Sequence, residues 1–122
     1  HINASGDIEP CVFCHFAVDN IRRTSLKDAL GSSLFRKIRE KQGEHENLLR
    51  PCMLIDHPEN GREFFESEGA YPTHEGAEEI FTGLSDQMDQ YSRKYGEIAD
   101  QVWEEEFREH PAFNKKNGTC NG

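Results

Sequence analysis

The sequence is short of apolar residues. Of its 122 residues, 34% are hydrophobic and 30% are charged, and the mean hydropathy is −0.85. No apolar run approaches the roughly 18 residues that a membrane-spanning helix needs. The chain also lacks the short motifs that mark phosphate loops, zinc protease helices, calcium loops and nucleophile elbows. These absences predict a thin hydrophobic core, a heavily charged surface and a protein that is not an enzyme.

Length and charge limit the organisation further. A chain of 122 residues fits one domain, because domains typically contain about 100–150 residues. The net charge of −9 is unevenly spread: residues 1–50 hold eight Lys/Arg against seven Asp/Glu (+1), and residues 51–122 hold six against sixteen (−10). A chain this acidic repels phosphate, so no nucleic-acid partner is expected.

Helical periodicity dominates the second half of the chain. Over residues 73–109 the apolar side chains recur at alternating steps of four and three, which is the spacing of a helical seam and excludes a strand. The seam consists of Ala77, Phe81, Leu84, Met88, Tyr91, Tyr95, Ile98 and Val102. Gly83 followed by Ser85 predicts that this helix bends or splits, since glycine ends helices and serine caps them. Pro111 ends the helix.

Two shorter helices are predicted upstream. Pro10 suits the first turn of one helix, where its missing N–H costs nothing. Ser25 caps the next helix, which Gly43 ends. The predicted elements are helices over 10–23, 25–42 and 73–109, a loop-rich segment over 44–72 and a tail over 111–122. The predicted fold class is therefore all-α, a small helical bundle that disulfide bonds hold together, with one long C-terminal helix.

An even number of cysteines occurs in this short chain: Cys11, Cys14, Cys52 and Cys120. N-glycosylation sequons begin at Asn3 and Asn117. Together with a thin core, these features predict a secreted or secretory-pathway glycoprotein stabilised by disulfide bonds. A disulfide between positions i and i+3 of a helix is geometrically poor. Cys11 and Cys14 are therefore each predicted to pair with one of the two distant cysteines.

The string Cys11-Val12-Phe13-Cys14-His15 supports a second interpretation. C-x-x-C-H is the attachment pattern of c-type haem, in which the two thiols bind the vinyl groups and the histidine ligates the iron. An electron-carrying cytochrome is therefore one alternative function. A zinc site formed by Cys11, Cys14, Cys52 and a histidine lacks the second closely spaced ligand pair that zinc sites usually have. We predict no cofactor and no metal, with disulfide bonding as the leading role of the cysteines.

The first predicted helix carries a family resemblance. The pattern Cys11-x-x-Cys14-x-Phe16-x-Val18-x-x-Ile21 resembles the opening helix of saposin-like domains. A C-x-x-C near the N-terminus, followed by long helices, also resembles the helical-bundle ectodomains of sperm–egg adhesion proteins. Both resemblances imply secreted helical domains that bind lipid, membrane or another protein without catalysis.

We therefore expect a secreted, non-enzymatic protein that binds a protein partner through a helical surface. A saposin-like module that binds lipid or membrane is the other alternative. The candidate protein-binding surface is the aromatic and acidic end of the long helix: Trp103, Phe107, Glu104 and Glu105. The candidate contacts for anionic lipid lie on the second helix: Arg36, Lys37, Arg39 and Lys41. Homo-oligomerisation is compatible with the same helical surfaces.

Overall fold

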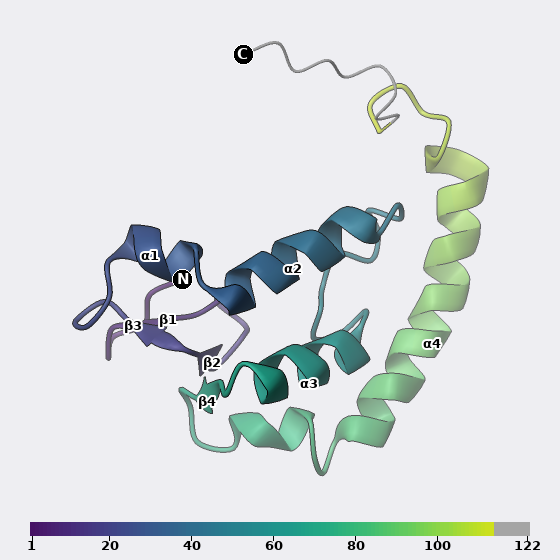
Figure 1. The fold of residues 1–122 in the computed structure, drawn as a ribbon. Coiled ribbons are helices and arrows are strands. Elements are labelled where there is room, and N and C mark those ends of the chain that lie inside the picture. The colour runs from purple at the N-terminus through teal and green to yellow at the C-terminus, as the bar shows by residue number, and fades with distance from the viewer. Residues whose placement is uncertain (114–122) are drawn as a thin grey trace.

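The computed structural model describes residues 1–113, which form a mixed α/β fold of four α-helices and two small antiparallel sheets (Figure 1). The helices are α1 (Leu26–Leu30), α2 (Ser33–Glu44), α3 (Pro58–Ser67) and α4 (Ser85–Val102). The strands are β1 (Asp7–Ile8), β2 (Phe16–Ala17), β3 (Asp19–Asn20) and β4 (Tyr71–Pro72). The predicted all-α, disulfide-stapled fold is therefore wrong.

Turns and strands replace the predicted helix over residues 10–23. β1 pairs with β3, and β2 pairs with β4, which follows α3. Phe13 and His15 are exposed, whereas Cys14 and Phe16 are buried. This alternation is the two-residue period of an extended chain, in which successive side chains point to opposite sides. Cys14, at the end of a turn, and Phe16, at the start of β2, therefore reach the core without forming a helical stripe.

Helical residues occupy most of the segment 25–42, but they form two helices. Ser25 Oγ accepts the Asp28 N–H at 3.1 Å, which is the capping bond that the sequence predicts. Gly31 caps the C-terminal end of α1, and Ser32 then caps α2 by accepting the Phe35 N–H at 3.5 Å. Gly31 and the capping Ser32 therefore divide the single helix predicted over 25–42 into α1 and α2.

α3 is a ten-residue helix within the segment 44–72, which is predicted to be loop-rich. Pro58 occupies its first turn, where a missing N–H costs nothing. Phe64 and Phe65 are buried on the side that faces the core. α2 and α3 lie side by side and run in opposite directions (Figure 1).

The hydrophobic core lies between β2, α2 and α3. The Phe16 ring stacks on the Phe65 ring with centroids 4.9 Å apart, and Phe81 packs against the two rings at 5.0 and 5.6 Å. The other buried members of the core are Cys14, Leu34, Ile38, Leu54 and Phe64. Aromatic contacts of this kind add specific geometry to apolar burial. The contacts among these three rings join β2 to α3 and to the segment that precedes α4.

The long C-terminal helix is shorter than the predicted span of 73–109. α4 begins at Ser85, directly after the predicted break at Gly83, and a 3₁₀ helix over Ala77–Ile80 precedes it. A π-helical turn, Trp103–Phe107, continues α4 at its far end. None of the helices in residues 1–113 has both the length and the apolar content that a membrane crossing requires.

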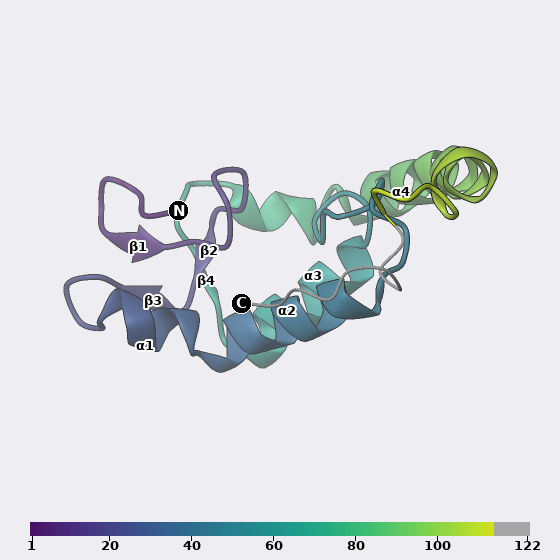
Figure 2. The same ribbon diagram turned by 90° about the horizontal axis from the view of Figure 1, so that it is seen from above.

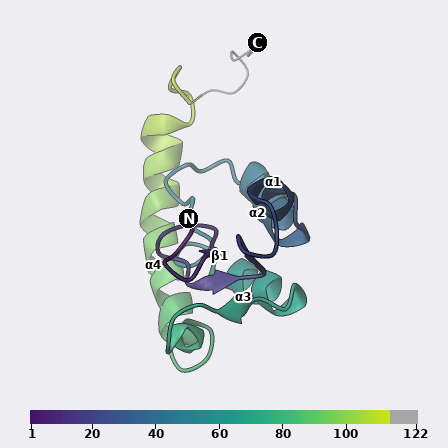
Figure 3. The same ribbon diagram turned by 90° about the vertical axis from the view of Figure 1, so that its left-hand side faces the viewer.

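Small residues of α4 face the rest of the protein. Ser92, Gly96 and Ala99 are buried, whereas Tyr91 and Ile98 of the predicted seam are exposed. Figures 2 and 3 show α4 at one side of the molecule, with the connection between α2 and α3 reaching towards it. The predicted seam therefore coincides only in part with the surface through which α4 docks, because Tyr95 contacts Leu49 whereas Tyr91 and Ile98 are exposed.

Candidate functional site

Three cysteines from two separate segments line one cavity. Its volume is about 420 Å³, and Cys11, Cys14 and Cys52 all contribute to its wall. Most of the remaining wall is apolar and comes from α2 and from the segment after residue 50: Phe35, Ile38, Pro51, Met53 and Leu54. Arg39 and Gln42 add polar groups. The fold therefore brings three sulfur atoms to a single, largely apolar compartment.

The first two cysteines occupy the turn that follows β1. Pro10 precedes the turn, and the Cys14 N–H donates across it to the Cys11 carbonyl oxygen at 3.1 Å. Cys11 is exposed, whereas the exposed fraction of Cys14 is 1%. The turn therefore places one thiol at the protein surface and the other in the core.

Cys52 lies in the connection between α2 and α3, where hydrogen bonds restrain its backbone. The Cys52 N–H donates to Asp56 Oδ2 at 2.8 Å. The Cys52 carbonyl oxygen accepts the N–H groups of Asp56 at 2.8 Å and of His57 at 3.2 Å. The backbone that carries this third thiol is therefore held at both of its polar groups.

The Cys14 thiol is strongly perturbed by its surroundings. Burial raises the pKa of Cys14 from its ordinary value of 9.0 to about 12, and negative charge on Cys11, Glu9 and Cys52 adds to the increase. The Cys14 thiol is protonated near neutral pH in the metal-free protein, and metal binding would release its proton.

Alkylation of the metal-free protein is expected to reach Cys14 on the order of a hundredfold more slowly than Cys11, because only an accessible thiolate reacts. Cys14 is shielded from the reagent, and its high pKa keeps the thiolate fraction small. Peptide mass mapping after brief iodoacetamide treatment at neutral pH measures both rates. Unfolding in urea should remove the difference. Equal rates in the folded protein would contradict the burial of Cys14.

Within residues 1–113, Cys52 does not form the predicted disulfide with Cys11 or Cys14. Cys11, Cys14 and Cys52 are free thiols, so the predicted bond between Cys52 and one of the first two cysteines is wrong. Cys120, the predicted partner of the other, lies outside the described residues. Disulfide bonding therefore no longer supports the prediction of a secreted protein. The extracellular or secretory location itself stays a prediction.

The first glycosylation sequon lies in a hydrogen-bonded loop. Asn3 Nδ2 donates to Asp7 Oδ2 and to Glu9 Oε1, at 3.2 Å each. The nitrogen that would carry a glycan is therefore used to join the loop to β1 and to the residue after it. Asn117 lies outside the described residues. Glycosylation stays a prediction at both positions.

His15 does not join the cysteine cavity, although the C-x-x-C-H string predicts that it acts beside Cys14. Its ring packs against His74 with centroids 5.3 Å apart, and its Nδ1 lies 3.9 Å from Glu9 Oε1. His15 is absent from the wall that Cys11 and Cys14 line. The three residues of the predicted haem site therefore do not converge.

The aromatic end of α4 packs within the described residues. Trp103 is buried, and its ring lies 6.3 Å from that of Phe107 and 6.0 Å from that of Phe113, between centroids. Glu104 and Glu105 are exposed. Because Trp103 is covered, the four predicted partner-binding residues do not form one accessible surface.

The four predicted lipid contacts lie along α2 and bind groups of the chain itself. Their partners are the Gly31 carbonyl for Arg36, Glu68 for Lys37, the Leu30 carbonyl for Arg39 and Glu44 for Lys41. These bonds leave less free cationic charge for a lipid headgroup. Arg39 also lines the cysteine cavity.

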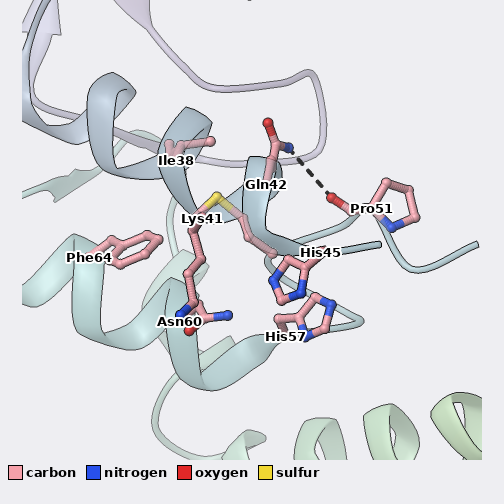
Figure 4. A pocket seen from close by; sticks show the side chains of 9 residues that line it. Ile38, Lys41, Gln42, His45, Pro51, His57, Asn60 and Phe64 are labelled. Carbon is pink, nitrogen blue, oxygen red and sulfur yellow. Dashed lines mark hydrogen bonds between the residues drawn. The ribbon is translucent and has the colours of Figure 1, made fainter. Parts of the chain in front are cut away.

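A second cavity, of only about 10 Å³, lies between α2 and α3 (Figure 4). The His45 and His57 rings stack beside it, with centroids 3.8 Å apart and an interplanar angle of 8°. Burial lowers the pKa of His45, and the charge of His57 adds to the decrease. The space holds at most a water molecule. It shares part of its lining with the cysteine cavity: Ile38, Gln42, Pro51 and Met53.

Among residues 1–113, no three His, Cys, Asp or Glu side chains lie close enough together to hold a single metal ion. The ligands of a polynuclear centre can lie further apart than those of a single ion, because the thiolates are distributed over more than one metal atom. A roomy cavity lined by three cysteines therefore fits a polynuclear centre better than a zinc ion.

A family model described as SPASM, an iron–sulfur cluster-binding domain, matches residues 1–54. The matched region is less than half of the chain and contains all three cysteines of the cavity. No curated protein and no solved structure matches the chain. The resemblances to saposin-like domains and to sperm–egg adhesion proteins are therefore wrong. The predicted secreted binding function and its lipid-binding and cytochrome alternatives are overturned by the same match.

Proposed function

We propose that this chain binds an iron–sulfur cluster through the thiolates of Cys11, Cys14 and Cys52. The observation that carries the proposal is the convergence of these three free cysteines on one cavity. Cysteine thiolates are the usual ligands of iron–sulfur clusters. The similarity of residues 1–54 to a cluster-binding domain supports the same assignment.

The cavity fits such a group in its chemistry and in its volume of about 420 Å³. Soft sulfur donors favour iron–sulfur centres. Cys14 would hold the cluster from the core and Cys11 from the protein surface, while the apolar wall limits the access of water. Iron–sulfur clusters usually have four cysteine ligands. The remaining ligand position therefore belongs to a group outside this set of three.

Such a cluster supplies one-electron chemistry when it is bound. The chain's own residues bind it, exclude water from it and set the charge around it. SPASM domains are found in radical SAM enzymes, so we place the chain as the cluster-binding part of such an enzyme. The expectation of a purely non-enzymatic protein is thereby not supported. The three cysteines are assigned to cluster binding, and no residue is assigned a catalytic role.

Anaerobic reconstitution with ferrous iron and sulfide tests the proposal. The wild-type protein is expected to gain visible charge-transfer absorbance and to bind iron and acid-labile sulfide together. The matched control is the triple variant Cys11→Ala/Cys14→Ala/Cys52→Ala, which retains Cys120 and is expected to bind little of either. Equal iron and sulfide contents in the two proteins would contradict the proposal. So would a wild-type protein that binds zinc but takes up no sulfide.

A further inference from the structure

Asp56 is a buried carboxylate that binds the backbone of a proposed cluster ligand. Its exposed fraction is 5%, and its Oδ2 accepts the Cys52 N–H at 2.8 Å. The Asp56 N–H donates back to the Cys52 carbonyl oxygen, also at 2.8 Å. Asp56 therefore holds both backbone polar groups of Cys52.

α4 fixes Asp56 from the other side. The Asp56 carbonyl oxygen accepts the Ser92 hydroxyl at 2.6 Å and Arg50 Nη2 at 3.0 Å. Arg50 Nη1 in turn lies 3.1 Å from Asp100 Oδ2 of α4. A continuous set of hydrogen bonds therefore connects α4 with Asp56 and, through it, with Cys52.

Gly96 allows α4 to approach this closely. A Cβ atom at position 96 would lie 2.9 Å from both Cζ and Nη1 of Arg50, closer than non-bonded atoms normally pack. The Tyr95 hydroxyl, one residue away, donates to the Leu49 carbonyl oxygen at 2.9 Å. The inner face of α4 is therefore shaped to bind the connection between α2 and α3.

We infer that Asp56 is a positioning residue for Cys52 and that α4 holds Asp56 in place through hydrogen bonds. As a statement about cluster binding, this inference rests on the proposed function. The hydrogen bonds themselves belong to the metal-free protein. Asp56 and α4 both lie beyond the matched region, residues 1–54. The inference thus gives the later part of the chain a role, which is to hold the third cysteine at the cavity.

The Asp56 carboxylate also sets the charge beside this ligand. Reduction adds an electron to an iron–sulfur cluster, and nearby negative charge opposes that addition. The Cys52 N–H donates to Asp56 and is therefore not directed to a cluster sulfur. Both effects lower a cluster's reduction potential. A neutral side chain that keeps the hydrogen bond is expected to raise the potential.

Three variants test these roles. Asp56→Ala removes the acceptor and the charge, Asp56→Asn removes the charge and keeps an acceptor oxygen, and Asp86→Ala is the matched control at an exposed position of α4. In the metal-free protein, exchange of the Cys52 amide is expected to accelerate in Asp56→Ala and to stay near wild type in Asp56→Asn. In the loaded protein, Asp56→Ala should weaken iron binding about 10- to 100-fold. Asp56→Asn should retain iron and show a higher midpoint potential.

The outcomes separate the inference from the proposed function. Wild-type amide exchange and iron binding in Asp56→Ala would overturn the positioning role, and a wild-type midpoint potential in Asp56→Asn would overturn the role of the charge. If circular dichroism shows that Asp56→Ala does not fold, Ser92→Ala decides the positioning role. This variant removes the hydroxyl that donates to the Asp56 carbonyl oxygen. It should accelerate Cys52 amide exchange about two- to tenfold. Unchanged exchange in Ser92→Ala would overturn the inference.

A wild-type protein that takes up no cluster contradicts the proposed function. The exchange rates of the Cys52 amide still decide whether Asp56 holds Cys52.

Discussion

Cys14→Ala is expected to abolish stable cluster binding, whereas Cys11→Ala is expected only to weaken it. Cys14 has an exposed fraction of 1%, so water or a small thiol replaces the lost ligand less readily there than at an exposed position. Cys11 is exposed, and a solvent thiol can take its place. Iron and sulfide contents after anaerobic reconstitution, followed by the rate of iron loss to a chelator, measure the difference.

Alanine is the suitable replacement because a buried cysteine behaves as a small apolar side chain. The metal-free fold should therefore survive Cys14→Ala, and thermal unfolding followed by circular dichroism checks that it does. Adding a small thiol should restore iron retention in Cys11→Ala but not in Cys14→Ala. Equal losses in the two variants, with no thiol rescue of either, would show that burial does not distinguish the two ligands.

The cysteines could be identified from the sequence, but their chemistry could not. A C-x-x-C pair with distant cysteines suits disulfides, haem, zinc and iron–sulfur clusters, because each uses thiols at short spacing. The deciding fact is that Cys52 reaches the same cavity as Cys11 and Cys14 while all three remain free. That convergence depends on the path of the connection between α2 and α3. Residue spacing carries no information about such a path.

The N-terminal segment shows why the fold class cannot be predicted from apolar periodicity. Cys11, Cys14, Val18 and Ile21 recur at helical spacing, so apolar periodicity predicts a helix. Over Phe13 to Phe16 the burial alternates instead, and β2 pairs with a strand that lies after α3. Two-residue strands are too short to produce a recognisable period. Their formation depends on a partner that is distant in the sequence.

The sequence predicts α4 as a helix but predicts only part of its docking face. The predicted seam consists of large apolar residues, which an amphipathic helix normally buries. Ile98 is 65% exposed, whereas Gly96 and Ala99 are buried. Polar bonds from Ser92 and to Asp100 join α4 to the connection between α2 and α3. The face through which a helix docks by small residues and hydrogen bonds cannot be recognised from the spacing of its large apolar residues.

Phe65→Ala is expected to destabilise the protein by about 3–5 kcal/mol, the usual cost of truncating a buried phenylalanine. Phe65 is 3% exposed and contacts Phe16 and Phe81. Its loss would leave a cavity where β2, α3 and the segment before α4 meet. Urea unfolding followed by circular dichroism measures the change in the free energy of unfolding, and the unfolding midpoint should fall sharply. Since β2 directly follows the turn that carries Cys14, iron retention is expected to fall as well.

The matched control for this truncation is Phe13→Ala. Phe13 is 80% exposed although it lies beside Cys14 in the sequence, so removing its ring exposes no core. Its free energy of unfolding should stay within about 0.5 kcal/mol of wild type, as for most surface substitutions. If both variants lost comparable stability, the two rings would be buried to a similar extent. The alternating burial that directs Cys14 to the core and Phe13 to the solvent would then be wrong.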